Sequence, residues 1–215
     1  MAFDLNTLLS AELHDLKNQL QNVLSIEDDL LSCDATPVIQ AKLARLKNQT
    51  NLLKDKTIEL LSVIKMKQED FRASIFENYL SDSLDGLVPE LQAQYPGCAI
   101  SHAVDADSSA WYDEQLLCLA LRNAIVNAAQ AGASNVHISA RENNGALIIN
   151  VQDNGPGFPA DLIGKNIAQL SGTEHGLGLY LIDKVMALHS RGEQIGHIEL
   201  SNPPGGGSCL QLCLP

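Results

Sequence analysis

Residues 146–157 read ALIINVQDNGPG, an apolar run that ends in an aspartate and a glycine-rich turn. The β-branched and leucine residues predict a buried strand over Ala146–Gln152, which places Asp153 at the strand end. A carboxylate there can accept a hydrogen bond from an exocyclic amine such as that of adenine. Gly155 and Gly157 allow the backbone to approach a ligand closely and to adopt positive φ. This stretch therefore predicts one wall of a nucleotide site.

Two helices are predicted to complete the nucleotide site. The first, Asp113–Ala131, carries Asn123 and Asn127, whose spacing of four places both amides on one face among small residues. An amide oxygen is a hard ligand that suits a Mg²⁺ ion bridging phosphates. The second helix opens on Gly176-Leu177-Gly178-Leu179, where free N–H groups and the helix dipole favour phosphate.

In chain order, Asn123–Asn127, Asp153–Gly157 and Gly176–Leu179 resemble the N, G1 and G2 boxes of the GHKL-type ATP-binding fold shared by histidine kinases, gyrase, Hsp90 and MutL. The tail Gly205–Pro215 resembles the last strand of the histidine kinase branch, so the similarity runs from Ala110 to the end of the chain. It implies ATP and Mg²⁺ as cofactors, with Asn127 as the magnesium ligand. The cofactor-binding residues that it implies are Asn123, Asn127, Asp153, Gly155, Gly157, Gly176, Leu177 and Gly178.

Residues 1–70 contain no glycine and one proline, Pro37, and their apolar residues recur at spacings of three and four. The break at residues 32–37 separates two helices, with Thr36 as N-cap and Pro37 at the first helical position. Two helices alone bury such a seam poorly, so pairing of two chains into a four-helix bundle is expected. The seam comprises Leu9, Leu13, Leu16, Leu20 and Val23, then Ile39, Leu43, Leu46, Thr50, Leu53, Thr57, Leu60 and Ile64.

His14 is predicted to face solvent, because the leucine seam of its helix lies roughly 100–160° away around the helix axis. A lone surface histidine usually has no role, but His14-Asp15-Leu16-Lys17-Asn18 resembles the phosphoacceptor box of histidine kinases and precedes an ATP fold of that family. The resemblance implies that His14 accepts a phosphoryl group. Asp15 could hydrogen-bond one ring nitrogen, and Asn18 could orient a water for the reverse, hydrolytic reaction.

The remaining residues, 71–215, alternate between the helical and strand periods. They predict a two-layer α/β sandwich of the histidine kinase/gyrase/Hsp90 type, so that the whole chain is α+β with a helical hairpin of residues 1–70 in front. The expected helices are Glu77–Gln94, Asp113–Ala131 and Gly178–His189. The expected strands are Cys98–Val104, Val136–Arg141, Ala146–Gln152, Ile198–Ser201 and Cys209–Leu214.

The composition of the chain limits which binding partners and which cellular location are expected. A net charge of −12 argues against nucleic acid and against an anionic membrane surface. No apolar run approaches the ~18 residues of a spanning helix, and the N-terminus lacks a signal pattern. Five cysteines without metal-binding spacing predict reduced thiols, and together these features predict a cytoplasmic protein.

The leading hypothesis is a soluble histidine kinase that phosphorylates His14 from Mg²⁺–ATP and passes the phosphoryl group to an aspartate of a response-regulator receiver domain. A separate sensor protein acting in trans would fit, as would a core excised from a longer kinase. The alternative is a histidine phosphotransfer protein with a degenerate ATP-like domain, since Gln130 and Ala131 stand where many relatives have a lysine and an aromatic residue. A protein-serine kinase or ATP-gated module is a third possibility that leaves His14 unexplained.

Overall fold

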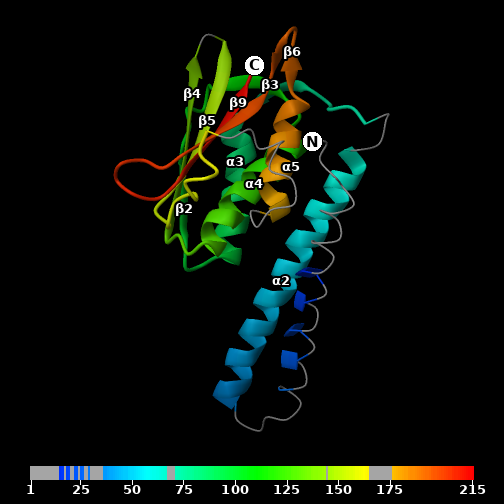
Figure 1. Cartoon of the computed structure of the whole chain (residues 1–215), viewed down its shortest axis with the longest axis vertical. Helices are drawn as coiled ribbons and strands as arrows, with labels where there is room; N and C mark the ends of the chain where they lie inside the picture. Colours follow the sequence, from blue (N-terminus) through cyan, green and yellow to red (C-terminus); the bar gives the residue numbers. More distant parts are fainter. Residues whose placement is uncertain are drawn as a thin grey trace. The chain divides into compact units, whose positions relative to one another are not determined.

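The computed structural model of the chain describes residues 36–66, 71–143, 145–164 and 176–215. Between residues 15 and 29 it also describes Asp15, Leu16, Asn18, Gln19, Asn22, Val23, Ser25, Ile26 and Asp29. The chain divides into two compact units, one of residues 1–71 with 171–177 and one of residues 72–170 with 178–215 (Figure 1). The assignment of these parts as a dimerisation domain and a catalytic domain stays a prediction.

The first unit consists of helix α2, Thr36–Met66, and the helical residues between Asp15 and Asp29, which Figure 1 shows beside it. Lys42 on α2 lies 3.8 Å from the Asp29 carboxylate, and Ile26 is buried. Leu16 and Val23, two residues of the predicted seam, are half-buried. The described part of this unit therefore has the helical pairing that the apolar spacing predicts.

The second unit is a five-stranded sheet with helices on one face, as Figure 1 shows, so the predicted two-layer α/β sandwich is confirmed. The strand order is β2-β4-β5-β9-β8, with β2 and β4 parallel and the other neighbours antiparallel. The strands are β2 (Ala99–Ala103), β4 (Asn135–Asn143), β5 (Ala146–Asp153), β8 (His197–Ser201) and β9 (Cys209–Leu214). The helices are α3 (Leu80–Gln94), α4 (Glu114–Gln130) and α5 (Gly176–Ala187).

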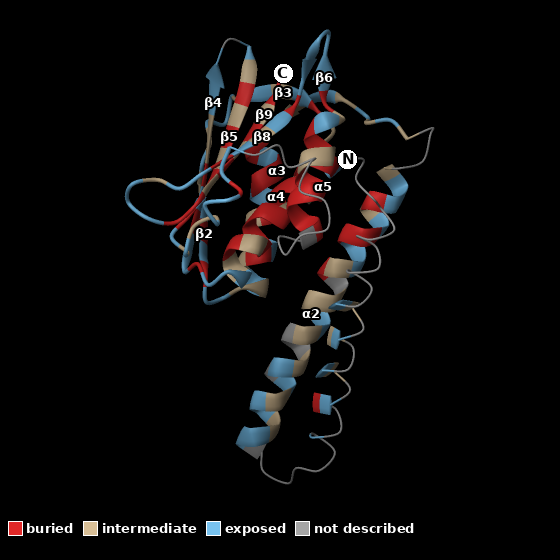
Figure 2. Cartoon of the chain, in the orientation of Figure 1, coloured by how far each residue is buried: buried red, intermediate tan, exposed pale blue. Residues whose placement is uncertain are grey.

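The core of the second unit lies between the sheet and the helices, where Figure 2 shows the buried segments in red. Alternate residues of the central strands are buried because successive strand side chains point to opposite faces. Each fully buried aliphatic side chain contributes about 1.5–3 kcal/mol. The buried strand residues include Val136, Ile138, Leu147, Ile149, Val151, Leu210, Leu212 and Leu214.

Four short strands depart from the sequence prediction. The helix expected from Glu77 starts only at Leu80, because β1 (Phe76–Tyr79) precedes it and pairs antiparallel with β3 (Ser109–Tyr112). Aromatic residues favour the strand conformation there. After α5, a small hairpin forms from β6 (Ser190–Arg191) and β7 (Gln194–Ile195).

The cysteines in the described part of the chain, Cys98, Cys118, Cys209 and Cys213, are free thiols. Burial, reinforced by the charge of Glu114, raises the pKa of Cys118 to about 11. Burial also raises the pKa of the other three thiols, which are therefore protonated and weakly nucleophilic near neutral pH. Separately, none of the helices that the structure describes combines the length and the apolar character needed to cross a membrane.

Asp113 joins three segments of the second unit. Its Oδ1 accepts the Leu116 N–H at 3.0 Å and caps α4, while its Oδ2 accepts the Ser74 N–H at 2.7 Å. The Asp113 N–H donates to Nε2 of His189, 3.0 Å away, and Nδ1 of His189 lies 2.9 Å from the Val185 carbonyl. Because Nε2 accepts, Nδ1 carries the proton and donates to Val185. His189, only 1% exposed, thus fixes the end of α5 to the start of α4 as a neutral imidazole.

This geometry predicts an acid-sensitive fold. Burial lowers the pKa of His189 below its ordinary value of 6.5. Below that value the unfolded chain binds a proton that the folded chain resists, so the free energy of unfolding should fall as the pH drops below about 6.5. His189→Leu should cost about 1–3 kcal/mol at neutral pH, because the half-buried Asp113 N–H loses its acceptor, and should flatten this pH dependence. Urea unfolding between pH 5 and pH 8 would measure both the free energy of unfolding and its dependence on pH. His197→Gln, at an exposed histidine, is the control.

Candidate nucleotide-binding site

Asp153 ends β5 and is 9% exposed. One of its carboxylate oxygens, Oδ1, accepts the Gly155 N–H at 2.7 Å, and the other, Oδ2, accepts the hydroxyl of Ser208. Each ionised carboxylate oxygen has a second acceptor position. The carboxylate is therefore held in one orientation and can still accept a hydrogen bond from an amino group of a ligand.

Two glycines shape the backbone around Asp153. A Cβ at Gly155 would lie 2.9 Å from Oδ1 of Asp153, so a side chain there would displace the carboxylate. Gly207 has φ +79°, and a Cβ there would lie 1.8 Å from the Asp153 carbonyl oxygen. The β8–β9 loop can approach Asp153 so closely only because residue 207 is glycine.

Asn127 and Gly178 bring α4 and α5 together. A Cβ at Gly178 would lie 2.8 Å from Nδ2 of Asn127, so the amide rests against the bare backbone near the start of α5. Asn127 is half-buried on α4. The structure therefore places the predicted magnesium ligand beside the helix start that is predicted to face phosphate. Gly176 begins that helix, and Leu177, fully buried, has no exposed side chain to offer a ligand.

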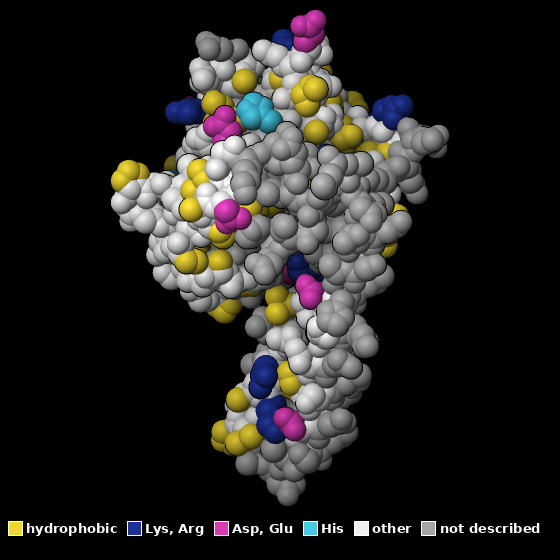
Figure 3. Space-filling model, in the orientation of Figure 1, with side chains coloured by type: hydrophobic (Ala, Val, Ile, Leu, Met, Phe, Trp, Pro, Cys, Tyr) yellow, Lys and Arg dark blue, Asp and Glu magenta, His cyan; other side chains and the backbone are white. Residues whose placement is uncertain are grey.

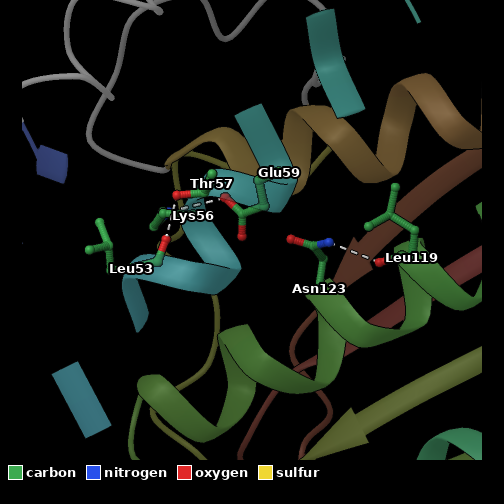
Figure 4. Close-up of polar contacts among 6 residues, drawn as sticks. All are labelled: Leu53, Lys56, Thr57, Glu59, Leu119 and Asn123. Atoms are coloured by element: carbon green, nitrogen blue, oxygen red, sulfur yellow. Dashed lines mark hydrogen bonds and ion pairs between the residues drawn. The ribbon is translucent and has the colours of Figure 1, made fainter. Parts of the chain in front are cut away.

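Asn123 differs from Asn127 in that its amide bonds to its own helix. Its Nδ2 donates to the Leu119 carbonyl at 2.8 Å, one turn back along α4, as Figure 4 shows. The residue is 4% exposed. One half of the Asn123 amide is thus engaged by its own helix, which leaves Oδ1 as the atom with capacity for a further contact.

Two residues around Asp153 were not predicted as site residues. The Ser208 hydroxyl donates to the Asp153 carboxylate. The Asn202 side chain makes two hydrogen bonds of 2.8 Å with the backbone of Phe158, in which it accepts from the N–H and donates to the carbonyl. Gly157, at φ +84°, leaves room for the Asn202 side chain, because a Cβ at residue 157 would lie 3.1 Å from the Asn202 amide. The β8–β9 loop therefore fixes both ends of the turn that follows Asp153. The run of three glycines before Ser208 was the sequence signal for such a close approach.

The described residues fit an adenine nucleotide. The oriented carboxylate of Asp153 suits an exocyclic amine, and the Asn127 amide beside Gly178 suits a hard cation and phosphate. Asp15 and Asn18 are exposed on the first unit, whereas His14, which is predicted to face solvent, lies outside the described residues.

Fold and site together define a GHKL-type ATP-binding domain. Residues 112–215 match the sequence profile of the histidine kinase-, DNA gyrase B- and HSP90-like ATPases. The signal transduction histidine-protein kinase AfsQ2 of Streptomyces coelicolor is 28% identical over 97% of this chain. The chain spans 39% of the length of AfsQ2 and 11% of that of the sensor kinase TmoS of Ectopseudomonas mendocina, which is 31% identical over 47% of this chain.

Solved structures agree with this assignment. The ATP-binding domain of PrrB from Mycobacterium tuberculosis superimposes with a TM-score of 0.54 at 28% identity, covering 66% of this chain and 96% of that domain. The histidine kinase ThkA, in a complex with the response regulator TrrA, gives a TM-score of 0.67 at 17% identity, covering 96% of this chain and 60% of that one. The resemblance to the core of a two-component sensor histidine kinase is confirmed.

Proposed function

We propose that this chain is a histidine protein kinase that phosphorylates His14 from Mg²⁺–ATP. The observation that carries the proposal is the Asp153 carboxylate, oriented by Gly155 and Ser208 at the end of β5. Holding such a group in place is what recognition of an adenine amine requires. Its kinship with histidine kinases supports the same activity.

The residues have distinct roles in this proposal. Asp153 accepts from the adenine amine, Asn127 holds Mg²⁺, and the glycines of both loops leave room for the nucleotide backbone. ATP, when bound, supplies the phosphoryl group. His14 is the nucleophile, Asp15 orients its imidazole, and Asn18 serves a phosphatase reaction on the regulator.

Nucleotide titration of the whole chain tests the ATP-binding half of the proposal. Calorimetry should detect ATP binding that strengthens when Mg²⁺ is added, and Asn127→Ala should remove this magnesium effect, because the variant lacks the amide oxygen that ligates the metal. Asn143→Ala, on the exposed end of β4, is the matched control. An absence of binding at millimolar ATP would favour the phosphotransfer alternative, which needs no nucleotide.

The proposed partner of the phosphorylated chain is a response regulator with a receiver domain. ThkA, whose structure this chain resembles in fold, was solved in complex with the response regulator TrrA. A separate sensor protein would supply the signal in trans. Free thiols and the acidic charge are consistent with a cytoplasmic location, which belongs to the same proposal.

Homodimerisation through α2 is also part of the proposal. Leu43, Leu61 and Ile64 are 50%, 59% and 43% exposed. Leu43, Thr50, Thr57 and Ile64 recur every seven residues, which places them on one face. Figure 3 shows hydrophobic side chains at the surface of the part that α2 forms. A second chain would bury this face in a four-helix bundle.

The polar contacts of α2 are compatible with such a seam. The Thr57 hydroxyl donates to the Leu53 carbonyl at 2.8 Å, so this seam residue satisfies its donor within its own helix (Figure 4). Lys56 lies 3.3 Å from the carboxylate of Glu59, one turn further along α2. A threonine satisfied in this way can enter an apolar interface at low cost.

Leu43→Glu should therefore separate the dimer. Each chain would lose burial of a leucine worth about 1.5–3 kcal/mol, so the dimer dissociation constant should rise at least about 100-fold. Light scattering should report a mass falling from two chains to one of 23.2 kDa. Ala41→Glu adds the same charge to an exposed position on the opposite side of α2 and should leave the mass unchanged. A wild-type monomer would contradict the proposed interface.

A further inference from the structure

The ribbon formed by β1 and β3 carries exposed aromatic residues that the proposed kinase activity does not use. The chain has four phenylalanines, four tyrosines and one tryptophan. Phe76, Tyr79 and Trp111 all lie on this ribbon and are 65%, 49% and 61% exposed. Large aromatic side chains are usually buried to a greater extent, and a cluster of exposed ones marks an interaction surface.

The register of the ribbon defines one outward face. Glu77 lies opposite Trp111, and Tyr79 lies opposite Ser109. Since side chains alternate along a strand, these four residues share one face, and Tyr112 points to the other. Tyr112 is fully buried, so its face is turned to the core at that strand, although Phe76, opposite Tyr112 on the same face, is exposed at the edge of the ribbon. The four residues Glu77, Tyr79, Ser109 and Trp111 therefore form an outward surface, here called the ribbon surface.

The carboxylate on the ribbon surface is held in place. The Ser109 hydroxyl donates to Oε1 of Glu77 at 3.0 Å, across the diagonal of the strand pair. Glu77 is thus directed along the ribbon between the positions of Trp111 and Tyr79. An oriented carboxylate next to exposed aromatic rings suits a lysine or arginine side chain, which can pair with the acid and stack on a ring.

The charge around the ribbon surface has a single sign. Residues 73–121 contain eight aspartates and glutamates and neither lysine nor arginine. This segment builds β1, α3, β2, β3 and the first part of α4. Asp105 and Asp107 lie in the loop that leads into β3. Such a concentration of negative charge attracts cationic partners and steers them to this side of the second unit.

We propose that the ribbon surface docks an arginine- or lysine-rich segment of a partner protein. The proposal goes beyond the kinase activity and does not depend on it, because the ribbon surface shares no residue with the nucleotide site. Nucleic acid carries the same charge sign as this surface and is repelled. Glu77 would pair with the cationic group, and Trp111 and Tyr79 would cover its aliphatic stem.

Trp111 is the sole tryptophan of the chain and therefore reports on this surface directly. Titration of the purified chain with a nona-arginine peptide at about 150 mM salt, where long-range attraction is screened, should change its fluorescence in a saturable way. Glu77→Gln and Tyr79→Ala should each weaken binding about three- to five-fold, as expected for loss of one exposed ion pair or cation–π contact.

Glu199→Gln is the matched control, because it removes one negative charge from an exposed side chain on β8. It should leave the affinity for the peptide unchanged. Two outcomes would overturn the proposal. One is an absence of saturable fluorescence change, and the other is equal weakening by Glu77→Gln and Glu199→Gln, which would show that only net charge matters.

Discussion

Asp153→Asn should weaken the binding of ATP about 10- to 100-fold while the domain stays folded. A hydrogen bond to a charged group contributes about 1.5–3 kcal/mol, and the amide can present a donor where the adenine amine needs an acceptor. The carboxylate is anchored by Gly155 and Ser208, so the variant changes the chemistry of the group more than its position. Titration with a fluorescent ATP analogue measures the loss, and thermal unfolding checks the fold.

Two further variants sharpen this result. Ser208→Ala should weaken ATP binding less than Asp153→Asn does, because it removes only one of the two bonds that orient the carboxylate. Asp105→Asn replaces a carboxylate on the loop before β3 and should bind ATP normally. Unaltered affinity in Asp153→Asn would show that this residue does not contact the nucleotide.

His14→Gln should abolish incorporation of the γ-phosphoryl group of ATP. The imidazole nitrogen is the proposed nucleophile, and a glutamine amide cannot replace it. ATP binding should be unchanged, because His14 and Asp153 belong to different compact units of the chain. Autoradiography after incubation with γ-labelled ATP measures incorporation, and the analogue titration measures binding.

His197→Gln is the control for this experiment, since His197 is an exposed histidine on β8. It should incorporate label as the unaltered chain does. Full incorporation by His14→Gln would refute the assignment of the phosphoacceptor and would favour the protein-serine kinase. Loss of label incorporation in both His14→Gln and His197→Gln would point to an indirect effect on folding.

The central strands could be predicted from sequence because their apolar residues form long, regular runs. Ala146–Gln152 was expected, and β5 covers Ala146–Asp153. By contrast, β1 and β3 have four residues each and are separated by 29 residues along the chain. A strand of four residues is too short to show a period, and its partner lies beyond any local window. For this reason the sequence predicts a helix from Glu77, which includes Tyr79 of β1.

Separation along the chain also explains which residues of the candidate site could be predicted from sequence and which could not. Asp153 and the glycines stand next to each other, so a local pattern reveals them. Ser208 meets Asp153 from 55 residues away, and Asn202 meets Phe158 from 44 residues away. The spacing of Asn123 and Asn127 predicts that both amides share one face, but it cannot reveal that Nδ2 of Asn123 bonds to its own helix.

The most direct test of the account is the chemical stability of the phosphoryl group that the chain acquires from γ-labelled ATP and Mg²⁺. A phosphohistidine is lost in acid and stable in base. The proposed activity predicts label with that behaviour on the unaltered chain. Label that survives acid would contradict it.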